Sequence, residues 1–228
     1  MIMSFGKRAV LAVGLVMAMA APGAAMAQNG AYPPDIHTDS GNRLPLVKRD
    51  SLDPTGQKTY DQLSSPSGGS LAGLRGPGGI MLYAPKVSEL NSALNRYLRS
   101  PETGFDGHVR ELAILVTARE FNSQFEWAAH ESVALKEGVP AATIDVVKHR
   151  KILRGVAEAD AVVIQLGREI YGNKKVSAAT YARAVKQFGP ERLINLVALM
   201  GNYAGTAALL ATFDMQLPPG QKPLLPTR

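Results

Sequence analysis

Hydrophobic residues recur along most of this chain at intervals of three and four, which is the spacing that one face of an α-helix presents. No segment alternates between apolar and polar residues for long enough to indicate a β-strand. The pattern therefore predicts an all-α protein. Its most informative stretch is residues 106–138, where ionisable side chains interrupt an otherwise apolar, strongly periodic sequence. We interpret the rest of the chain as the scaffold of this stretch.

Two consecutive helices are predicted within that stretch. The first spans residues 106–120, with Asp106 as its N-cap. After a short break, the second spans residues 123–137 and ends at Gly138, which tolerates the left-handed conformation common at helix C-termini. Because the connection is so short, we expect the two helices to pack as an antiparallel hairpin.

Three polar side chains share one face of the second helix. Ser123, Glu126 and His130 are spaced three and four residues apart. Glu111 lies about as far before the break as His130 lies after it, so an antiparallel hairpin would bring these two residues together. A carboxylate beside an imidazole orients the ring for general acid or base catalysis.

Each of these residues also has a structural interpretation. Ser123 and Glu126 fit the S-x-x-E capping box, in which two side chains satisfy free N–H groups at a helix start. His130 could be a hydrogen-bonded structural histidine, and Glu111 could form a salt bridge with its neighbour Arg110. The spacing alone leaves the catalytic and structural roles open.

The same residues carry a resemblance to a known family. The runs R-E-L-A-I-L, F-N-S-Q-F-E-W-A-A-H and A-L-K-E-G-V, with L-R-G-P upstream and Y-A-R-A-V-K-Q-F-G-P downstream, are similar to the signature of the carboxymuconolactone decarboxylase family. That family includes the alkylhydroperoxidase D-like proteins. The resemblance covers residues 71–219 and implies an alkylhydroperoxidase D-like helical bundle built around the central antiparallel hairpin.

The resemblance also implies an activity. In the peroxidase branch of the family, a glutamate, a C-x-x-C pair and a histidine form a proton relay and redox centre. The glutamate matches Glu111 and the histidine matches His130, but Ser123 and Glu126 occupy the cysteine positions. The E-W-x-x-H form resembles the decarboxylase branch instead. The resemblance therefore implies a cofactor-free lyase that decarboxylates a small carboxylated lactone or a related organic acid.

Roles follow from this resemblance for the individual residues. His130 is expected to deliver the proton, and Glu111 is expected to orient its ring. Glu126 lies in the first turn of its helix, where the helix dipole favours the ionised carboxylate and makes it a poorer acid, so we expect it to have a positioning role. The residues expected to bind the substrate are Ser123, Trp127 and Arg75.

Composition narrows the alternatives. The chain has no cysteine, which argues against an alkylhydroperoxidase-like antioxidant protein, since serine and glutamate cannot cycle through sulfenic acid and disulfide states. The histidines show no metal-binding spacing, and we predict no metal or other cofactor. The positive charge forms no basic stripe, which favours a small anionic ligand over nucleic acid. A non-catalytic helical oligomer that binds small acids stays open as a further alternative.

The N-terminal residues have the pattern of an export signal. Lys7 and Arg8 precede an apolar run, and A-M-A supplies a small-x-small cleavage site before Gln28. The run is shorter than the roughly 20 apolar residues that span a bilayer. We expect residues 1–27 to be a signal peptide that is cleaved after Ala27. The mature protein would then be periplasmic or secreted, with no stable membrane insertion.

The remaining segments complete the predicted organisation. Residues 28–52 are polar and broken by prolines, and we expect an extended or disordered arm. Residues 53–216 form one helical domain, and residues 217–228 form a Pro-rich tail that lies extended on a surface or is mobile. Outside the central stretch, a shaped loop is expected at residues 75–79 and helices are expected at residues 54–64, 85–98, 140–149, 157–171, 178–188 and 191–215.

Two of these helices are unusual in their apolar residues. Residues 85–98 carry an amphipathic stripe made of Val87, Leu90, Leu94, Tyr97 and Leu98. The helix at residues 191–215 is apolar on too many sides for one buried stripe, so its own domain or a neighbouring subunit should cover it on more than one side. Together with the resemblance, whose members commonly assemble as trimers or hexamers, this predicts a homo-oligomer.

Overall fold

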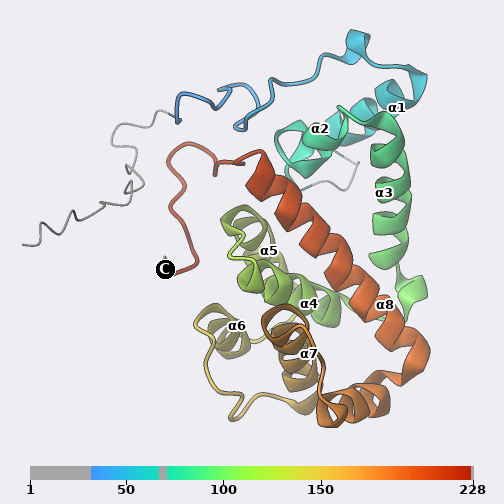
Figure 1. Cartoon of the computed structure of the whole chain (residues 1–228), viewed down its shortest axis with the longest axis vertical. Coiled ribbons are helices and arrows are strands. Elements are labelled where there is room, and N and C mark those ends of the chain that lie inside the picture. The colour runs from blue at the N-terminus through green and yellow to red at the C-terminus, as the bar shows by residue number, and fades with distance from the viewer. Residues whose placement is uncertain (1–31, 67–70, 227–228) are drawn as a thin grey trace, which may run out of the picture.

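The computed structural model describes residues 32–66 and 71–226, and this part of the chain is all-helical (Figure 1). It contains no β-strand, only an isolated bridge between His37 and Asn42. The all-α prediction is therefore confirmed. The predicted signal peptide and its cleavage site lie outside the described residues.

Eight α-helices make up the described part of the chain. They are α1 (Pro54–Ser64), α2 (Pro77–Met81), α3 (Pro85–Leu98), α4 (Gly107–Glu120), α5 (Gln124–Lys136), α6 (Ala141–Lys148), α7 (Glu158–Arg168) and α8 (Ala178–Thr212). The predicted caps are present, because the side chains of Asp53, Asp106 and Ser177 each accept a backbone N–H at the start of a helix. Helix α7 continues into a π-helical turn, Glu169–Asn173.

Helix α8 has a break where the sequence places one. Gly189 has a φ of 73°, a left-handed value that glycine adopts without strain, and Pro190 follows it. The two predicted helices thus follow each other directly and form one bent element. Among the described residues, α8 alone has the length and hydropathy of a membrane-spanning helix. One side of it belongs to the protein core, with buried residues that include Leu196 and Met200.

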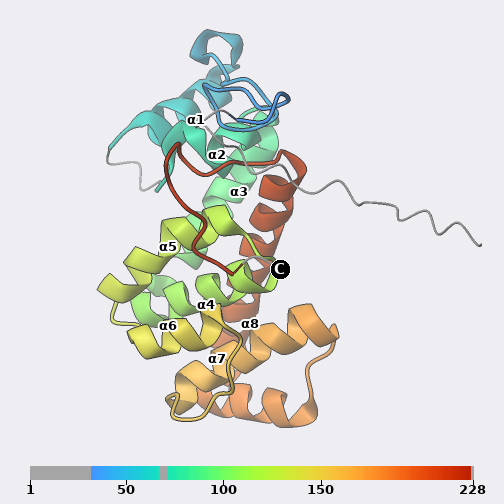
Figure 2. The ribbon, with the colours of Figure 1, turned by 90° about the vertical axis from the view of Figure 1, so that its left-hand side faces the viewer.

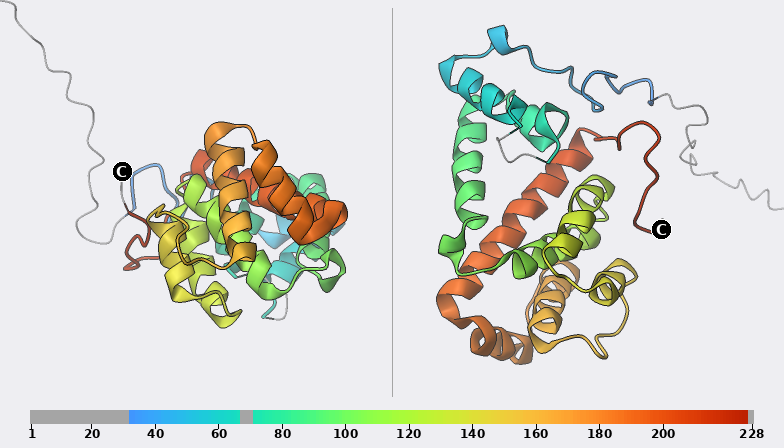
Figure 3. Two further views of the ribbon diagram at one scale, coloured as in Figure 1. Left: turned by 90° about the horizontal axis from the view of Figure 1, so that it is seen from below. Right: turned by 180° about the vertical axis from the view of Figure 1, so that it is seen from behind.

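Helix α4 is the centre of the core. It packs against α5, α6, α7 and α8, and every residue from Glu111 to Arg119 is buried. Helices α1, α2 and α3 lie on the opposite side of α8 from α4, α6 and α7 (Figures 1 and 3). Viewed from the side, α1–α3 form one end of the molecule and α6 and α7 the other (Figure 2). The domain is thus a helical bundle with α4 enclosed on all sides.

The short helix α2 replaces part of the loop predicted at residues 75–79. Gly76 is extended, and Pro77 follows at the first helical position, where its missing N–H leaves no hydrogen bond unmade. Gly79 is required by space, because a Cβ there would lie 1.9 Å from the carbonyl oxygen of Leu74. The glycines therefore permit a tight packed turn rather than an open loop.

The amphipathic stripe of α3 does not face the core. Leu98 is buried, but Val87, Leu90, Leu94 and Tyr97 are between 39% and 61% exposed. Their neighbour α8 exposes Ile194 and Val197, and a Cβ added at Gly201 or Gly205 would contact nothing. The two helices are joined by hydrogen bonds from Tyr97 to Asn195 and from Asn202 to Asn91. We call the six exposed apolar residues Val87, Leu90, Leu94, Tyr97, Ile194 and Val197 the α3/α8 face.

The described part of the predicted arm is fastened to the end of α8. The backbone N–H of Arg43 donates to the carbonyl of Phe213, and that of Gln216 donates to the carbonyl of Gly41. Ile36, Ser40 and Asn42 are buried between these bonds. This part of the segment is therefore held against the residues that follow α8 by two backbone hydrogen bonds.

The C-terminal tail is also anchored. The Gln124 side-chain carbonyl accepts the backbone N–H groups of Leu224 and Leu225, and its amide donates to the carbonyl of Leu225. The Leu225 side chain is 3% exposed and belongs to the hydrophobic core. The tail thus crosses the start of α5 at a defined place.

Close packing of α4, α7 and α8 yields a stability prediction. A Cβ added at Gly167 of α7 would lie 2.3 Å from Cγ1 of Val116, so Gly167→Ala should destabilise the fold by about 1–3 kcal/mol through overpacking. The same substitution should cost clearly less in a Val116→Ala background, where the clashing methyl is absent. Urea unfolding of the parent, the two single variants and the double variant measures this coupling. If Gly167→Ala lowered the free energy of unfolding equally in both backgrounds, the predicted contact would be contradicted.

Candidate functional site

Glu111 and His130 form a buried pair between α4 and α5. Nδ1 of His130 lies 2.6 Å from Oε2 of Glu111, and the two side chains are 7% and 1% exposed. The spacing argument predicted this approach. With the carboxylate ionised, Nδ1 carries the proton and donates it in this bond, so Nε2 is the ring nitrogen left for a ligand.

Two arginines surround the other oxygen of Glu111. Nη2 of Arg99 and Nε of Arg110 each lie 3.8 Å from Oε1, which has no hydrogen-bond partner. A buried carboxylate needs compensating charge, because taking it out of water is costly. The predicted pairing with Arg110 is therefore present, and Arg99, at the end of α3, joins it.

The ring of His130 is also held from α8. The Tyr203 ring meets it edge to face, with the centroids 5.3 Å apart. Burial raises the pKa of the Tyr203 hydroxyl, so this group stays neutral at physiological pH. The imidazole is thus fixed by a carboxylate on one side and an aromatic ring on another.

Glu126 differs sharply from the expectation made for it. The side chain is buried and neither carboxylate oxygen has a hydrogen-bond partner. Burial raises its pKa to about 8, and the nearby Ser123 side chain offsets this only in part. The prediction that the helix dipole keeps Glu126 ionised is therefore wrong at neutral pH, because desolvation outweighs the dipole. A pKa of about 8 keeps Glu126 mostly protonated at neutral pH.

The capping box is not formed. The side chain of Ser123 makes no cap hydrogen bond, and its backbone N–H donates to the carbonyl of Ala118 at 2.8 Å. The Glu126 side chain therefore does not accept a hydrogen bond from the backbone N–H of Ser123, as a capping box would require. The structural interpretation of this Ser–Glu spacing fails, and the burial of an unpartnered acid needs another explanation.

A cavity of about 560 Å³ is lined in part by Glu126. It lies between α1, α2, α3, α5 and α8, and its volume is typical of small-molecule sites, which measure roughly 300–1,000 Å³. The polar and ionisable groups that matter for chemistry in its wall are Arg96, Arg99, Glu126, His130, Asn202 and Tyr203. The cavity thus brings together an oriented imidazole, a neutral acid and two guanidinium groups.

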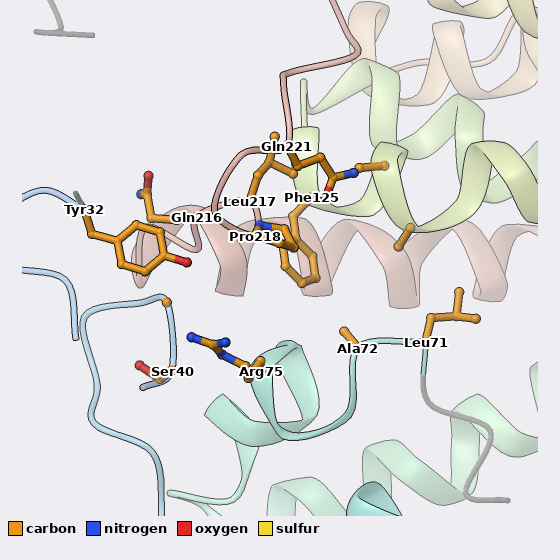
Figure 4. Close-up of a pocket in the computed structure, with 13 residues that line it drawn as sticks. Tyr32, Ser40, Leu71, Ala72, Arg75, Phe125, Gln216, Leu217, Pro218 and Gln221 are labelled. Atoms are coloured by element: carbon orange, nitrogen blue, oxygen red, sulfur yellow. The ribbon is translucent and has the colours of Figure 1, made fainter. Parts of the chain in front are cut away.

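The three predicted substrate-binding residues have different positions. Trp127 is fully buried, belongs to the hydrophobic core and lines neither this cavity nor its neighbour. Ser123 is partly buried and lines neither cavity. Arg75 lines a second, adjoining cavity of about 290 Å³ and donates to the carbonyl of Thr38 at 2.6 Å (Figure 4). Only Arg75 lies at a cavity wall.

The sequence analysis missed Arg96, Arg99 and Tyr203. Arg96 and Arg99 are three residues apart near the end of α3, so their shared face was visible in the sequence. Their approach to α5 depends on the tertiary arrangement and has no local signal. Tyr203 belongs to a helix that is apolar on most sides, so no pattern in the sequence marked it as a site residue.

Within residues 32–66 and 71–226, no three His, Asp or Glu side chains converge in the manner of a metal site. In comparisons with known proteins, no family model matches this chain, and no curated protein is significantly similar to it. The family resemblance therefore rests on the short motifs described above.

The protonation of Glu126 gives a testable pH dependence. Its pKa is raised from 4.5 to about 8 in the folded state, so between these values the unfolded chain releases a proton that the folded chain keeps. The contribution of Glu126 to the free energy of unfolding is therefore complete below about pH 4.5 and is lost as the pH rises to about 8. Urea titrations across this range measure it.

Glu126→Gln should remove this part of the pH dependence, because the amide does not titrate. Glu131→Gln, which changes a partly exposed glutamate on the same helix, serves as the matched control and should leave the slope in place. A Glu126→Gln variant whose unfolding free energy has the same pH slope as the parent would show that Glu126 is ionised in the folded protein.

Proposed function

We propose that this protein is a cofactor-free decarboxylase that acts on a small carboxylated lactone or a related unsaturated organic acid. One observation carries the proposal: a carboxylate-oriented imidazole and a neutral carboxylic acid line the same cavity as two arginines. The similarity of the E-W-x-x-H motif to the decarboxylase branch supports the same conclusion. The chain has no cysteine, which counts against the thiol peroxidase alternative.

The arginines select the charge of the substrate. Arg99 is partly buried and lies 3.8 Å from the Glu111 carboxylate, which it shares with Arg110 and His130. Arg96 lies one turn earlier on α3 and adds a second positive charge to the cavity. A guanidinium group binds a carboxylate through two parallel N–H donors. A small organic anion is therefore the expected ligand.

The reaction needs an electron sink and a proton. The bond between the carboxylate carbon and the ring breaks, carbon dioxide leaves, and the electron pair moves to the lactone carbonyl oxygen to give a dienolate. His130, protonated at Nε2 and held through Nδ1 by Glu111, then delivers its proton to carbon and regains one from water. The Glu111 carboxylate stabilises the imidazolium before this transfer.

Glu126 has a role that only a neutral acid can fill. A carboxylic acid that stays protonated near pH 7 can donate a hydrogen bond to the oxygen of the developing dienolate. An ionised carboxylate at this place would repel the same oxygen. The raised pKa of Glu126 therefore fits its position in the cavity wall.

The arrangement and location of the protein are part of the proposal. The contact between α4 and α5 and the bond between Glu111 and His130 support an alkylhydroperoxidase D-like bundle with a central antiparallel hairpin. The exposed α3/α8 face supports a homo-oligomer, a trimer or hexamer as in the family it resembles. The N-terminal signal motif supports export to the periplasm or medium, which the intact mass of the exported chain tests.

Turnover of acidic lactones by designed variants tests the residue roles. His130→Ala should lower the rate about 10²- to 10⁴-fold, the usual contribution of a general acid or base. Glu111→Gln should lose part of that factor, because the ring is less well oriented. Glu126→Gln keeps a hydrogen-bond donor and should be less impaired than Glu126→Ala. Ser123→Ala is the control within the same helix and should turn over normally.

A panel of carboxylated lactones, followed by carbon dioxide release, provides the measurement. Full activity of His130→Ala on a substrate that the parent decarboxylates would overturn the catalytic assignment. Binding of these acids without any turnover by the parent would favour the non-catalytic alternative.

The α3/α8 face makes the oligomer testable. Leu90 and Ile194 are 61% and 69% exposed, so Leu90→Glu and Ile194→Glu should fold as the parent does but dissociate the assembly, since each would bury a charge at the subunit contact. Ile152→Glu is the matched control, because Ile152 is 74% exposed and lies outside this face. Light scattering at micromolar concentration reports the mass. A monomeric parent would refute the proposed assembly.

A further inference from the structure

The second cavity lies directly beside the candidate site. It has a volume of about 290 Å³ and is enclosed by four segments that are far apart in the sequence (Figure 4). These are the N-terminal segment with Tyr32 and Ser40, the turn before α2 with Arg75, helix α5 with Phe125, and the tail with Leu217. The candidate site therefore adjoins a second cavity that the proposed chemistry does not use.

The two cavities share part of their walls. Leu71, Ala72, Phe125 and Ala129 line both of them. Phe125 and Ala129 are one turn apart on α5, and the residues that follow each of them are Glu126 and His130. The two cavities therefore adjoin along the turn of α5 that carries the reacting groups.

The walls of the two cavities differ in character. Ala128, Phe125, Leu217 and Pro218 form the apolar part of the second cavity's wall, which also carries Ser40, Gln216 and Gln221 but no acidic residue, whereas the first cavity contains two arginines and Glu126. A cavity of about 150 Å³ is enough to hold a benzene molecule, so 290 Å³ accommodates an apolar ring or a short chain. The guanidinium of Arg75 stands at one edge, with one N–H given to the carbonyl of Thr38.

Hydrogen bonds fix the walls of the second cavity. Gln216 binds Gly41 through the backbone, which joins the tail to the N-terminal segment. Gln124 holds the tail again at Leu224 and Leu225. Walls fixed in this way cost little ordering entropy when a ligand binds.

We propose that the two cavities are the two lobes of one binding site, and that the ligand is an organic acid with an apolar ring or chain beyond its reacting end. The carboxylate and reacting centre occupy the lobe of Arg99, Glu126 and His130, and the apolar group occupies the lobe of Phe125, Ala128 and Leu217. This inference rests on the proposed function for the acid-binding lobe and adds the substrate class. In this inference, Ala128 and the tail limit the size of the apolar group that the site accepts.

Binding of two matched acids tests the second lobe without requiring turnover. Isothermal titration calorimetry compares butyrate with 4-phenylbutyrate on the mature chain. The phenyl compound should bind about ten-fold more tightly or better, the gain expected from burying an aromatic ring. Ala128→Phe fills the second lobe and should abolish this preference while leaving butyrate binding unchanged. Ser132→Phe, one turn further on α5 and in neither cavity wall, is the control.

The possible outcomes distinguish failure of the two-lobed site from failure of the proposed function. Equal affinity of the parent for the two acids, or a phenyl preference that survives Ala128→Phe, overturns the two-lobed site. If Ala128→Phe does not fold, Leu217→Trp fills the same lobe from the tail and takes its place. Arg99→Gln should weaken both acids equally. If it weakens neither, the acid-binding lobe of the proposed function fails, whereas a normal Arg99 effect without any phenyl preference refutes this inference alone.

Discussion

The burial of the Glu111 carboxylate is the constraint on which the structure depends. Glu111 lies in the second turn of α4, the central helix of the core, and its side chain is 1% exposed. Breaking a buried ion pair by removing one partner costs about 3–5 kcal/mol, because it leaves an uncompensated charge. The positions of His130 on α5 and Arg99 at the end of α3 are therefore tied to α4 by the need to compensate this one group.

This constraint also gives the cavity its chemical asymmetry. Glu111 pairs with His130 and two arginines, whereas Glu126, buried one turn before His130, has no partner. Burial without a partner raises the pKa of Glu126 to about 8. Two carboxyl groups in different environments can thus divide the work between an ionised orienting group and a neutral hydrogen-bond donor. The division follows from which of the two carboxyl groups lies beside the positively charged side chains.

Local patterns predicted the elements well because their causes are local. The caps at Asp106 and Ser177 and the break at Gly189 depend on residues within one turn, and the structure has them where the sequence places them. The approach of Glu111 to His130 could be predicted as well, because two helices with a short connection fix the distance of each residue from the turn. This pair is the part of the site that sequence reasoning reached.

Features that depend on remote segments could not be predicted in this way. The dipole argument for Glu126 failed because the burial that raises its pKa comes from tertiary packing and has no signature within α5. Trp127 follows Glu126 directly and seemed suited to a ligand, but consecutive helical residues point in directions about 100° apart, and the core takes the tryptophan. The anchored tail depends on the Gln124 side chain, which lies about a hundred residues away in the sequence.

The exposure of α3 connects the cavity to the proposed assembly. Helix α3 supplies Arg96 and Arg99 to the cavity, yet its main contacts are with α1, α2, α8 and the turn at Pro101–Thr103 rather than with α4 or α5. Its opposite side belongs to the exposed α3/α8 face. A subunit packed on that face would press α3 against α8 and fix the two arginines relative to His130. Such an assembly would set the geometry of the acid-binding lobe from outside the subunit, without contributing any residue to it.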